Sequence, residues 1–92
     1  MIVSFRHKGL KRLFELGDRS LVRADLLRRI ENIPATLDAA DSLRALDLPG
    51  YRLHPLKGDR KGFWAVAVRA NCRIVFRFEG GDAFDVELTD YH

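Results

Sequence analysis

The chain has 92 residues, 47% of them hydrophobic and 32% charged, which fits one small folded domain with one modest core. No apolar run approaches the roughly 18 residues of a membrane helix, and basic residues interrupt the apolar start, so neither a membrane protein nor an exported one is expected and the cytoplasm is the expected location. The single cysteine, Cys72, excludes an internal disulfide and a cysteine-rich zinc site.

The first residues predict a strand followed by a short helix. Residues 2–5 form a short apolar run that is typical of a strand. Leu10, Leu13 and Phe14 then recur at helical spacing before Gly17, which predicts a short amphipathic helix that ends at this glycine.

A longer helical stripe covers residues 26–40. Pro34 lies inside it, and proline removes a backbone donor and clashes with the preceding turn, so a kink or break is expected near residues 30–33. Leu43 and Leu46 predict one further turn, which Pro49 and Gly50 should end.

After Gly50 the pattern becomes strand-like. Residues 63–69 are rich in aromatic and β-branched side chains, and residues 72–78 and 84–89 alternate, with a turn at Gly80, Gly81 and Asp82 between them. The alternation places Cys72, Ile74, Phe76 and Phe78 on a core face and Arg73, Val75 and Arg77 on the other face. In the last strand it places Phe84, Val86 and Leu88 opposite Asp85, Glu87 and Thr89.

Tight turns between consecutive strands favour antiparallel pairing, and the N-terminal helices should cover the apolar face of the sheet. The sequence therefore predicts an α+β fold, with N-terminal helices packed on one face of a small, mainly antiparallel sheet. Residues 1–92 are expected to form a single domain.

Charge is unevenly distributed along the chain. Residues 51–78 contain seven Lys or Arg and one Asp, whereas residues 79–92 contain five Asp or Glu and no Lys or Arg. A basic stretch is what a polyanion-binding surface needs, because each cation placed against a phosphate releases counterions. A solvated basic face is the alternative.

The stretch from His54 to Gly62 is the first candidate site. It places an imidazole at a strand end and follows it with Lys57, Arg60 and Lys61 in a loop with two glycines. Histidine exchanges protons near neutral pH, and lysine and arginine hold phosphate charge. The alternative is a surface turn that needs its glycines for the backbone.

The last three residues, Asp90, Tyr91 and His92, are the second candidate site. Metal-free RNA cleavage needs one group that takes a proton from the ribose 2′-hydroxyl, another that protonates the leaving 5′-oxygen, and cations for the charged transition state. This chain offers all three. The alternative is that Tyr91 anchors the chain end in the core and His92 is solvated.

Other residues are weaker candidates. A metal site from His54, His92, Asp90 and Asp59 lacks the usual ligand spacings, so neither a metal nor another cofactor is expected. His7 is expected to be a surface residue at a helix start. Phe63 and Trp64 could stack on bases, although at least one should be core, and Cys72 is expected to be a small buried hydrophobe.

These features together resemble HigB toxins of the RelE/ParE superfamily. The resemblance covers nearly the whole chain, and its specific parts are the run His54-Pro-Leu-Lys-Gly-Asp-Arg60 and the Asp90-Tyr91-His92 ending. Further matching positions are Phe5, His7, Lys8, Gly9, Leu10, Lys11, Leu13, Phe14, Trp64, Asn71, Arg73, Ile74, Phe76, Gly81, Asp82 and Ala83.

The resemblance implies the toxin of a type II toxin–antitoxin system, a metal-independent endoribonuclease that cuts messenger RNA on the ribosome and is inhibited by a HigA antitoxin. Its catalytic set would be His54, Asp90, Tyr91 and His92. Lys57 and Arg73 would lie near the scissile phosphate, and Arg60 and Lys61 are expected to bind RNA with them.

Two residues depart from the family pattern. Cys72 stands where the family commonly has tryptophan, a change that should affect packing before chemistry, and Pro34 is unexpected in the second helix. Two other functions remain open: an RNA-binding or ribosome-binding module without chemistry, and a gyrase inhibitor of the ParE kind.

Overall fold

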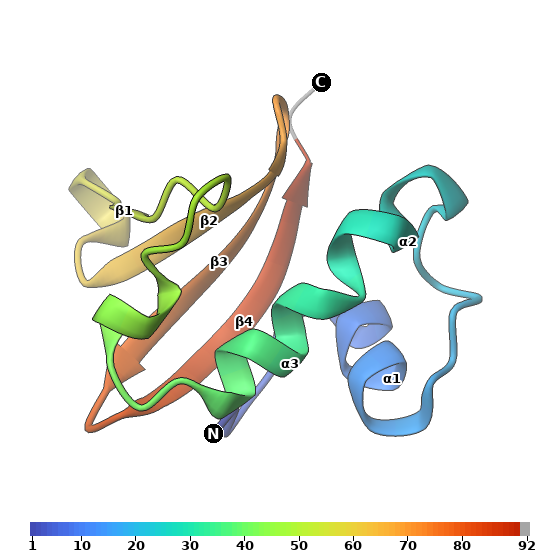
Figure 1. Cartoon of the computed structure of the whole chain (residues 1–92), viewed down its shortest axis with the longest axis horizontal. Coiled ribbons are helices and arrows are strands. Elements are labelled where there is room, and N and C mark those ends of the chain that lie inside the picture. The colour runs from blue at the N-terminus through green and yellow to red at the C-terminus, as the bar shows by residue number, and fades with distance from the viewer. Residues whose placement is uncertain (91–92) are drawn as a thin grey trace.

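A computed structural model describes residues 1–90 of the chain, which form three α-helices, two short 3₁₀ turns and a four-stranded sheet (Figure 1). The helical elements are α1 (Lys8–Leu16), α2 (Ala24–Ile30), α3 (Asn32–Ala39), η1 (Leu43–Leu46) and η2 (Gly58–Arg60). The strands are β1 (His54–Pro55), β2 (Phe63–Arg69), β3 (Cys72–Glu79) and β4 (Asp82–Asp90). None of the helices within the described residues has the length and apolarity needed to cross a membrane.

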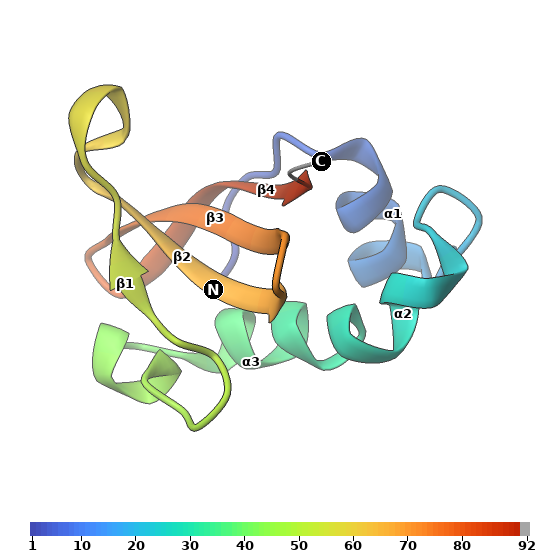
Figure 2. The ribbon, with the colours of Figure 1, turned by 90° about the horizontal axis from the view of Figure 1, so that it is seen from above.

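The sheet is antiparallel throughout, and its strand order β1-β2-β3-β4 follows the chain. Gly80 and Gly81 join β3 to β4 with φ angles of 58° and 83°, the left-handed values that a two-residue type I′ turn needs. Figure 2 shows α3 lying along one face of the strands, with α1 and α2 near its N-terminal end. The predicted α+β fold with helices on one face is therefore confirmed.

Residues 2–5 do not form the predicted strand. This segment pairs with β4 through two isolated bridges, because a bulge at Asp85 (φ 54°) interrupts the edge of β4 between them. At the bulge the Asp85 N–H donates to Ser4 Oγ at 2.9 Å. The bridges are parallel and join Ile2 to Ala83 and Phe5 to Val86.

The helical half follows its sequence signals. The Nδ1 atom of His7 accepts a hydrogen bond from the Leu10 N–H at 3.0 Å and so caps α1, which ends at Gly17 with φ 69°. The predicted break in the second helical stripe is confirmed, since α2 ends at Ile30 and α3 begins at Asn32. Pro34 lies in the first turn of α3, where a missing N–H costs least.

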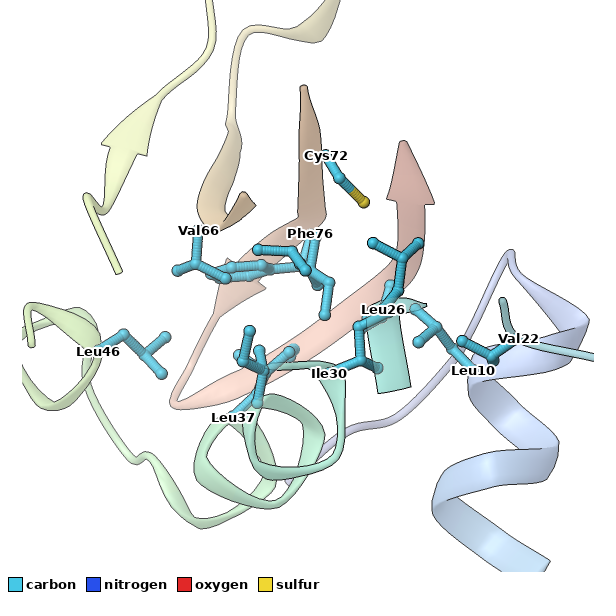
Figure 3. Packing of buried hydrophobic residues seen from close by; sticks show 14 of the residues in the cluster. Leu10, Val22, Leu26, Ile30, Leu37, Leu46, Val66, Cys72 and Phe76 are labelled. Atoms are coloured by element: carbon cyan, nitrogen blue, oxygen red, sulfur yellow. The ribbon is translucent and has the colours of Figure 1, made fainter. Parts of the chain in front are cut away.

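The core lies between the helices and one face of the sheet. Figure 3 shows Phe76 and Val66 of the sheet packed over Leu37 and Leu46 of the helical side. Cys72 is fully buried in the same cluster, as predicted. Burying each large aliphatic or aromatic side chain contributes about 1.5–3 kcal/mol.

One residue lies on the opposite face from the one that the alternation predicted, and one residue of the outer face is buried. A single residue, Phe76, lies opposite both Asp85 and Val86, and this extra residue in β4 shifts the alternation by one position. Phe84 is therefore opposite Arg77 on the outer face, which is the face away from the helices, and the Arg77 guanidinium lies 4.6 Å from its ring centre. Val75 belongs to the outer face by alternation but is buried.

Candidate active site

His54 is held at the start of β1 by a hydrogen bond to the preceding loop. Its Nδ1 lies 2.7 Å from the carbonyl oxygen of Arg52. Because a carbonyl can only accept, Nδ1 carries the proton, and the Nε2 lone pair of the neutral ring is available to receive another. Arg52 has a φ of 50°, a conformation that residues other than glycine rarely adopt and that clusters at functional sites.

His54 and Arg73 line one groove. It has a volume of about 600 Å³ and lies at the end of the sheet where β2 turns into β3. Arg73 is opposite Ala67, and His54 is opposite Ala65, so both residues belong to the outer face. The structure therefore brings together two of the predicted site residues that are far apart in the sequence.

Three arginines that were not singled out from the sequence line the same groove. They are Arg29 of α2, Arg52 of the loop before β1 and Arg69 at the end of β2. Arg52 and Arg69 lie in the basic stretch of residues 51–78, so the sequence pointed to that stretch but not to these two residues individually. Arg29 carried no comparable signal, because it looks like an ordinary exposed helix residue.

Two of these arginines are held in place by neighbouring elements. Arg29 Nη1 donates to the carbonyl oxygen of Val68 at 3.0 Å, and Arg69 Nη2 lies 2.9 Å from Asp25 Oδ2. Desolvation raises the pKa of Asp25, but hydrogen bonds from Arg23 and Arg69 outweigh it, so this pKa lies below its usual value. Asp25 is therefore ionised at neutral pH and fixes Arg69 against α2.

The basic loop after His54 forms a separate hollow. Lys57 and Lys61 line a pocket of about 340 Å³ together with Phe63 and Trp64, and His54 and Arg73 do not line it. Arg60 points elsewhere, since its Nη1 lies 2.6 Å from Glu87 Oε1. The structure thus separates the predicted phosphate-binding residues into two hollows and one ion pair.

The C-terminal candidates lie at the limit of the described residues. The backbone of Asp90 ends β4 opposite Cys72, next to Arg73 in β3. Tyr91 and His92 lie outside the described residues. Among the described side chains, those of residues 1–89, no group of three or more His, Cys, Asp or Glu is arranged to hold a metal ion.

The two aromatic candidates for base stacking, Trp64 and Phe63, both contact other side chains of the protein. Trp64 is partly buried and packs against the core cluster, while Phe63 lies under Arg60, whose guanidinium carbon is 5.7 Å from the ring centre. His7 caps α1, and desolvation, partly opposed by the charge of Glu87, lowers its pKa.

The groove has the parts that phosphate chemistry requires. His54 offers a nitrogen that can take a proton, and Arg73 with the three neighbouring arginines gives the groove a positive potential that attracts a phosphodiester and stabilises charge developing on it. Among the side chains of residues 1–89, no carboxylate lines the groove. This arrangement suits a polyanionic substrate that reacts at a phosphate.

Comparison with known proteins gives a consistent result. The family described as "RelE-like toxin of type II toxin-antitoxin system HigB" matches residues 3–92. The chain is 50% identical to "Endoribonuclease HigB" of Proteus vulgaris over 92 residues, which is 100% of both chains. It is 29% identical to "Toxin HigB-1" of Vibrio cholerae, with 99% of this chain and 98% of that protein covered.

Solved structures share the fold at low identity. A point mutant of YafQ from E. coli matches with a TM-score of 0.61 and 16% identity, covering 98% of this chain and 91% of that one. A YoeB/ParE toxin from Agrobacterium tumefaciens matches with a TM-score of 0.56 and 18% identity, covering 99% and 96%.

Proposed function

Because this chain belongs to the HigB family of RelE-like toxins of type II toxin–antitoxin systems, we propose that it cleaves messenger RNA on the ribosome by a metal-independent attack of a ribose 2′-hydroxyl. It is an endoribonuclease, the activity named for its relative at 50% identity over the full length. Ribosome dependence, the absence of a metal and the roles of the site residues are the proposed parts of this function.

The observation that carries the proposal is the groove shared by His54 and Arg73. With Nδ1 bound to the Arg52 carbonyl, Nε2 of His54 is available to take the proton from the 2′-hydroxyl. The 2′-oxygen then attacks the adjacent phosphorus, and the bond to the 5′-oxygen breaks. The products are a 2′,3′-cyclic phosphate and a 5′-hydroxyl, and a proton must be delivered to the leaving oxygen.

We assign that delivery to the chain end, where the family resemblance implies catalytic roles for Asp90, Tyr91 and His92. Arg73 stabilises the negative charge that develops on the phosphate oxygens. Lys57 and Lys61 line the neighbouring hollow, from which they can bind RNA beyond the scissile phosphate. Arg60 also belongs to the proposed RNA-binding set, and contact with RNA would require it to leave or share its ion pair with Glu87.

The system implies an antitoxin partner, and we propose that it is of the HigA kind. The proposed setting is the cytoplasm, where ribosomes and messenger RNA are present, and residues 1–92 are proposed to act as one toxin domain.

A cleavage assay with defined components tests the proposal. The protein is incubated with messenger RNA alone, with ribosomes programmed with that RNA, and with programmed ribosomes after EDTA treatment followed by return of only the Mg²⁺ that ribosomes need. Mapping of the RNA ends should show cuts only in the presence of ribosomes, with cyclic phosphate and 5′-hydroxyl termini. Equal cutting of naked RNA would refute ribosome dependence, and intact RNA with inhibited gyrase would point to the ParE-like alternative.

A further inference from the structure

The groove of the candidate active site continues beyond Arg29 into a second hollow. This hollow has a volume of about 290 Å³ and shares Arg29, Gly50, Ala67 and Val68 with the first groove. Its own lining includes Arg28, Asn32 and Tyr51. We call it the α2 hollow, and we refer to the two adjoining hollows together as the path, since they share these four lining residues.

The path exists because β2 is longer than its neighbour. β1 pairs with β2 at Ala65 and Trp64, and the Leu56 N–H donates to the Phe63 carbonyl at 2.9 Å. The edge of β2 beyond Ala65 is therefore left to other partners. Tyr51 provides one, since its carbonyl oxygen accepts the Ala67 N–H at 2.6 Å. Arg29 provides another by donating to Val68, which lies where the register of β2 and β3 shifts. These two hydrogen bonds therefore join this edge of β2 to the loop before β1 and to α2.

The path is positively charged along its length. Its two parts are lined by Arg28, Arg29, Arg52, Arg69 and Arg73, and by no carboxylate among residues 1–89, whose side chains the structure describes. Within the described residues, Arg28 and Arg52 form no ion pair. Their charges are therefore available to an external anion, whereas an ordinary structural arginine is neutralised by a neighbour.

The chemistry of the α2 hollow fits a nucleotide next to the catalytic groove. Its volume is at the lower end of the range of small-ligand sites, about 300 Å³. Tyr51 is half-buried and packs against the core cluster, and it also lines the hollow, where its accessible side can stack on a base. The exposed Asn32 offers an amide that can read a base edge. Arg28 offers a cation for the phosphate.

We propose that the α2 hollow is a second RNA subsite, in which Arg28 binds a backbone phosphate and Tyr51 stacks on a base of the strand that enters the catalytic groove, while Arg52 binds a phosphate of the same strand where the groove adjoins the hollow. This inference rests on the proposed ribonuclease function. The bound strand is either messenger RNA or an adjacent segment of ribosomal RNA, which present the same phosphate and base chemistry.

The test uses full-length variants that change charge with little strain. Arg28→Gln keeps a good helix former in α2, and Arg52→Asn keeps a residue that tolerates a positive φ. The lysine variants Arg28→Lys and Arg52→Lys retain the charge. Arg44→Gln is the matched control, because Arg44 is an exposed arginine that lines neither hollow.

Binding is measured by fluorescence anisotropy at several salt concentrations, with an uncleavable 2′-O-methyl RNA of twelve nucleotides and, separately, with ribosomes that carry no messenger RNA. The Arg28→Gln, Arg52→Asn double variant should bind about tenfold more weakly, and its salt slope should fall by about 0.7 for each phosphate that the protein no longer neutralises. The lysine variants should keep most of the binding. Weakening with the oligonucleotide identifies messenger RNA as the ligand, and weakening with ribosomes alone identifies ribosomal RNA.

Three results would overturn the subsite. They are parent-like affinity and salt slope of the double variant with both ligands, an equal loss in Arg44→Gln, and loss of antitoxin binding with RNA binding retained. Tyr51→Leu supplies an independent check, because it keeps an apolar side chain and removes the stacking ring, so it should weaken binding without changing the salt slope. RNA cleavage by the parent is scored separately, so a failure of the ribonuclease function is distinguishable from a failure of this subsite.

Discussion

Replacing Arg73 with alanine tests its proposed catalytic role, and a second arginine of β3, Arg77, provides the control. Arg73 and Arg77 both belong to the outer face of β3 by alternation. They are about 13 Å apart at roughly 3.3 Å per residue, which exceeds a Debye length of about 10 Å at 0.1 M salt. Arg73 lines the groove with His54, whereas Arg77 pairs with Glu79 at 2.8 Å.

The two substitutions should change different properties: Arg73→Ala should lower the cleavage rate, and Arg77→Ala should lower the stability of the fold. Arg73→Ala removes the cation that we propose stabilises developing phosphate charge, and a loss of this kind typically raises the barrier by about 2.7–4 kcal/mol and slows cleavage a hundredfold to a thousandfold. Arg77→Ala removes the contact with Phe84 and two partly exposed ion pairs, with Glu79 and Asp85, which together stabilise the fold by about 1 kcal/mol. Its melting temperature should fall by about 4–8 °C, with cleavage near the parent rate.

The assay is single-turnover cleavage of messenger RNA on programmed ribosomes, with the melting temperature of each variant measured by circular dichroism. Arg73→Lys should recover part of the rate, because it restores the charge without the guanidinium fork. A folded Arg73→Ala protein that cleaves within threefold of the parent would remove Arg73 from the site. An equal loss of rate in Arg77→Ala would show that the effect is one of overall charge.

Three further outcomes are expected. Cys72→Trp should lower the free energy of unfolding by about 1–3 kcal/mol, because an indole overpacks a fully buried thiol position; an unchanged urea midpoint would show that the core has room for it. Stability should decrease as the pH falls from 7 towards 5, because the pKa of His7 is lowered in the folded protein and the unfolded chain takes up the proton first; urea midpoints should lose this slope in His7→Asn, and a slope that persists would contradict it. Deletion of His92 should slow cleavage by about a hundredfold to ten thousandfold if it transfers a proton, and a deletion variant that cuts at the parent rate would make it a bystander.

Local periodicity determined most of the secondary structure. The helical spacing of α1, the break before Pro34 and the alternation of β3 all depend on residues within a few positions of one another, so the sequence alone predicted them. The same locality explains the errors. One extra residue at Asp85 moved Phe84 to the outer face, and the run over residues 2–5 formed only two bridges, because the sequence carried no signal for a bulge in the strand beside it.

The candidate site was predictable only in part. The run that begins at His54 and the strand that carries Arg73 are visible as chemistry in the sequence, and the family resemblance named the chain end. Only the tertiary structure placed Arg29, from the helical half, in the same groove as His54 and bound Arg60 to Glu87, 27 residues away. These arrangements depend on where β1 leaves the edge of β2 and on which carboxylate lies within reach. Both are decided by long-range packing, which residue type and spacing along the chain do not specify.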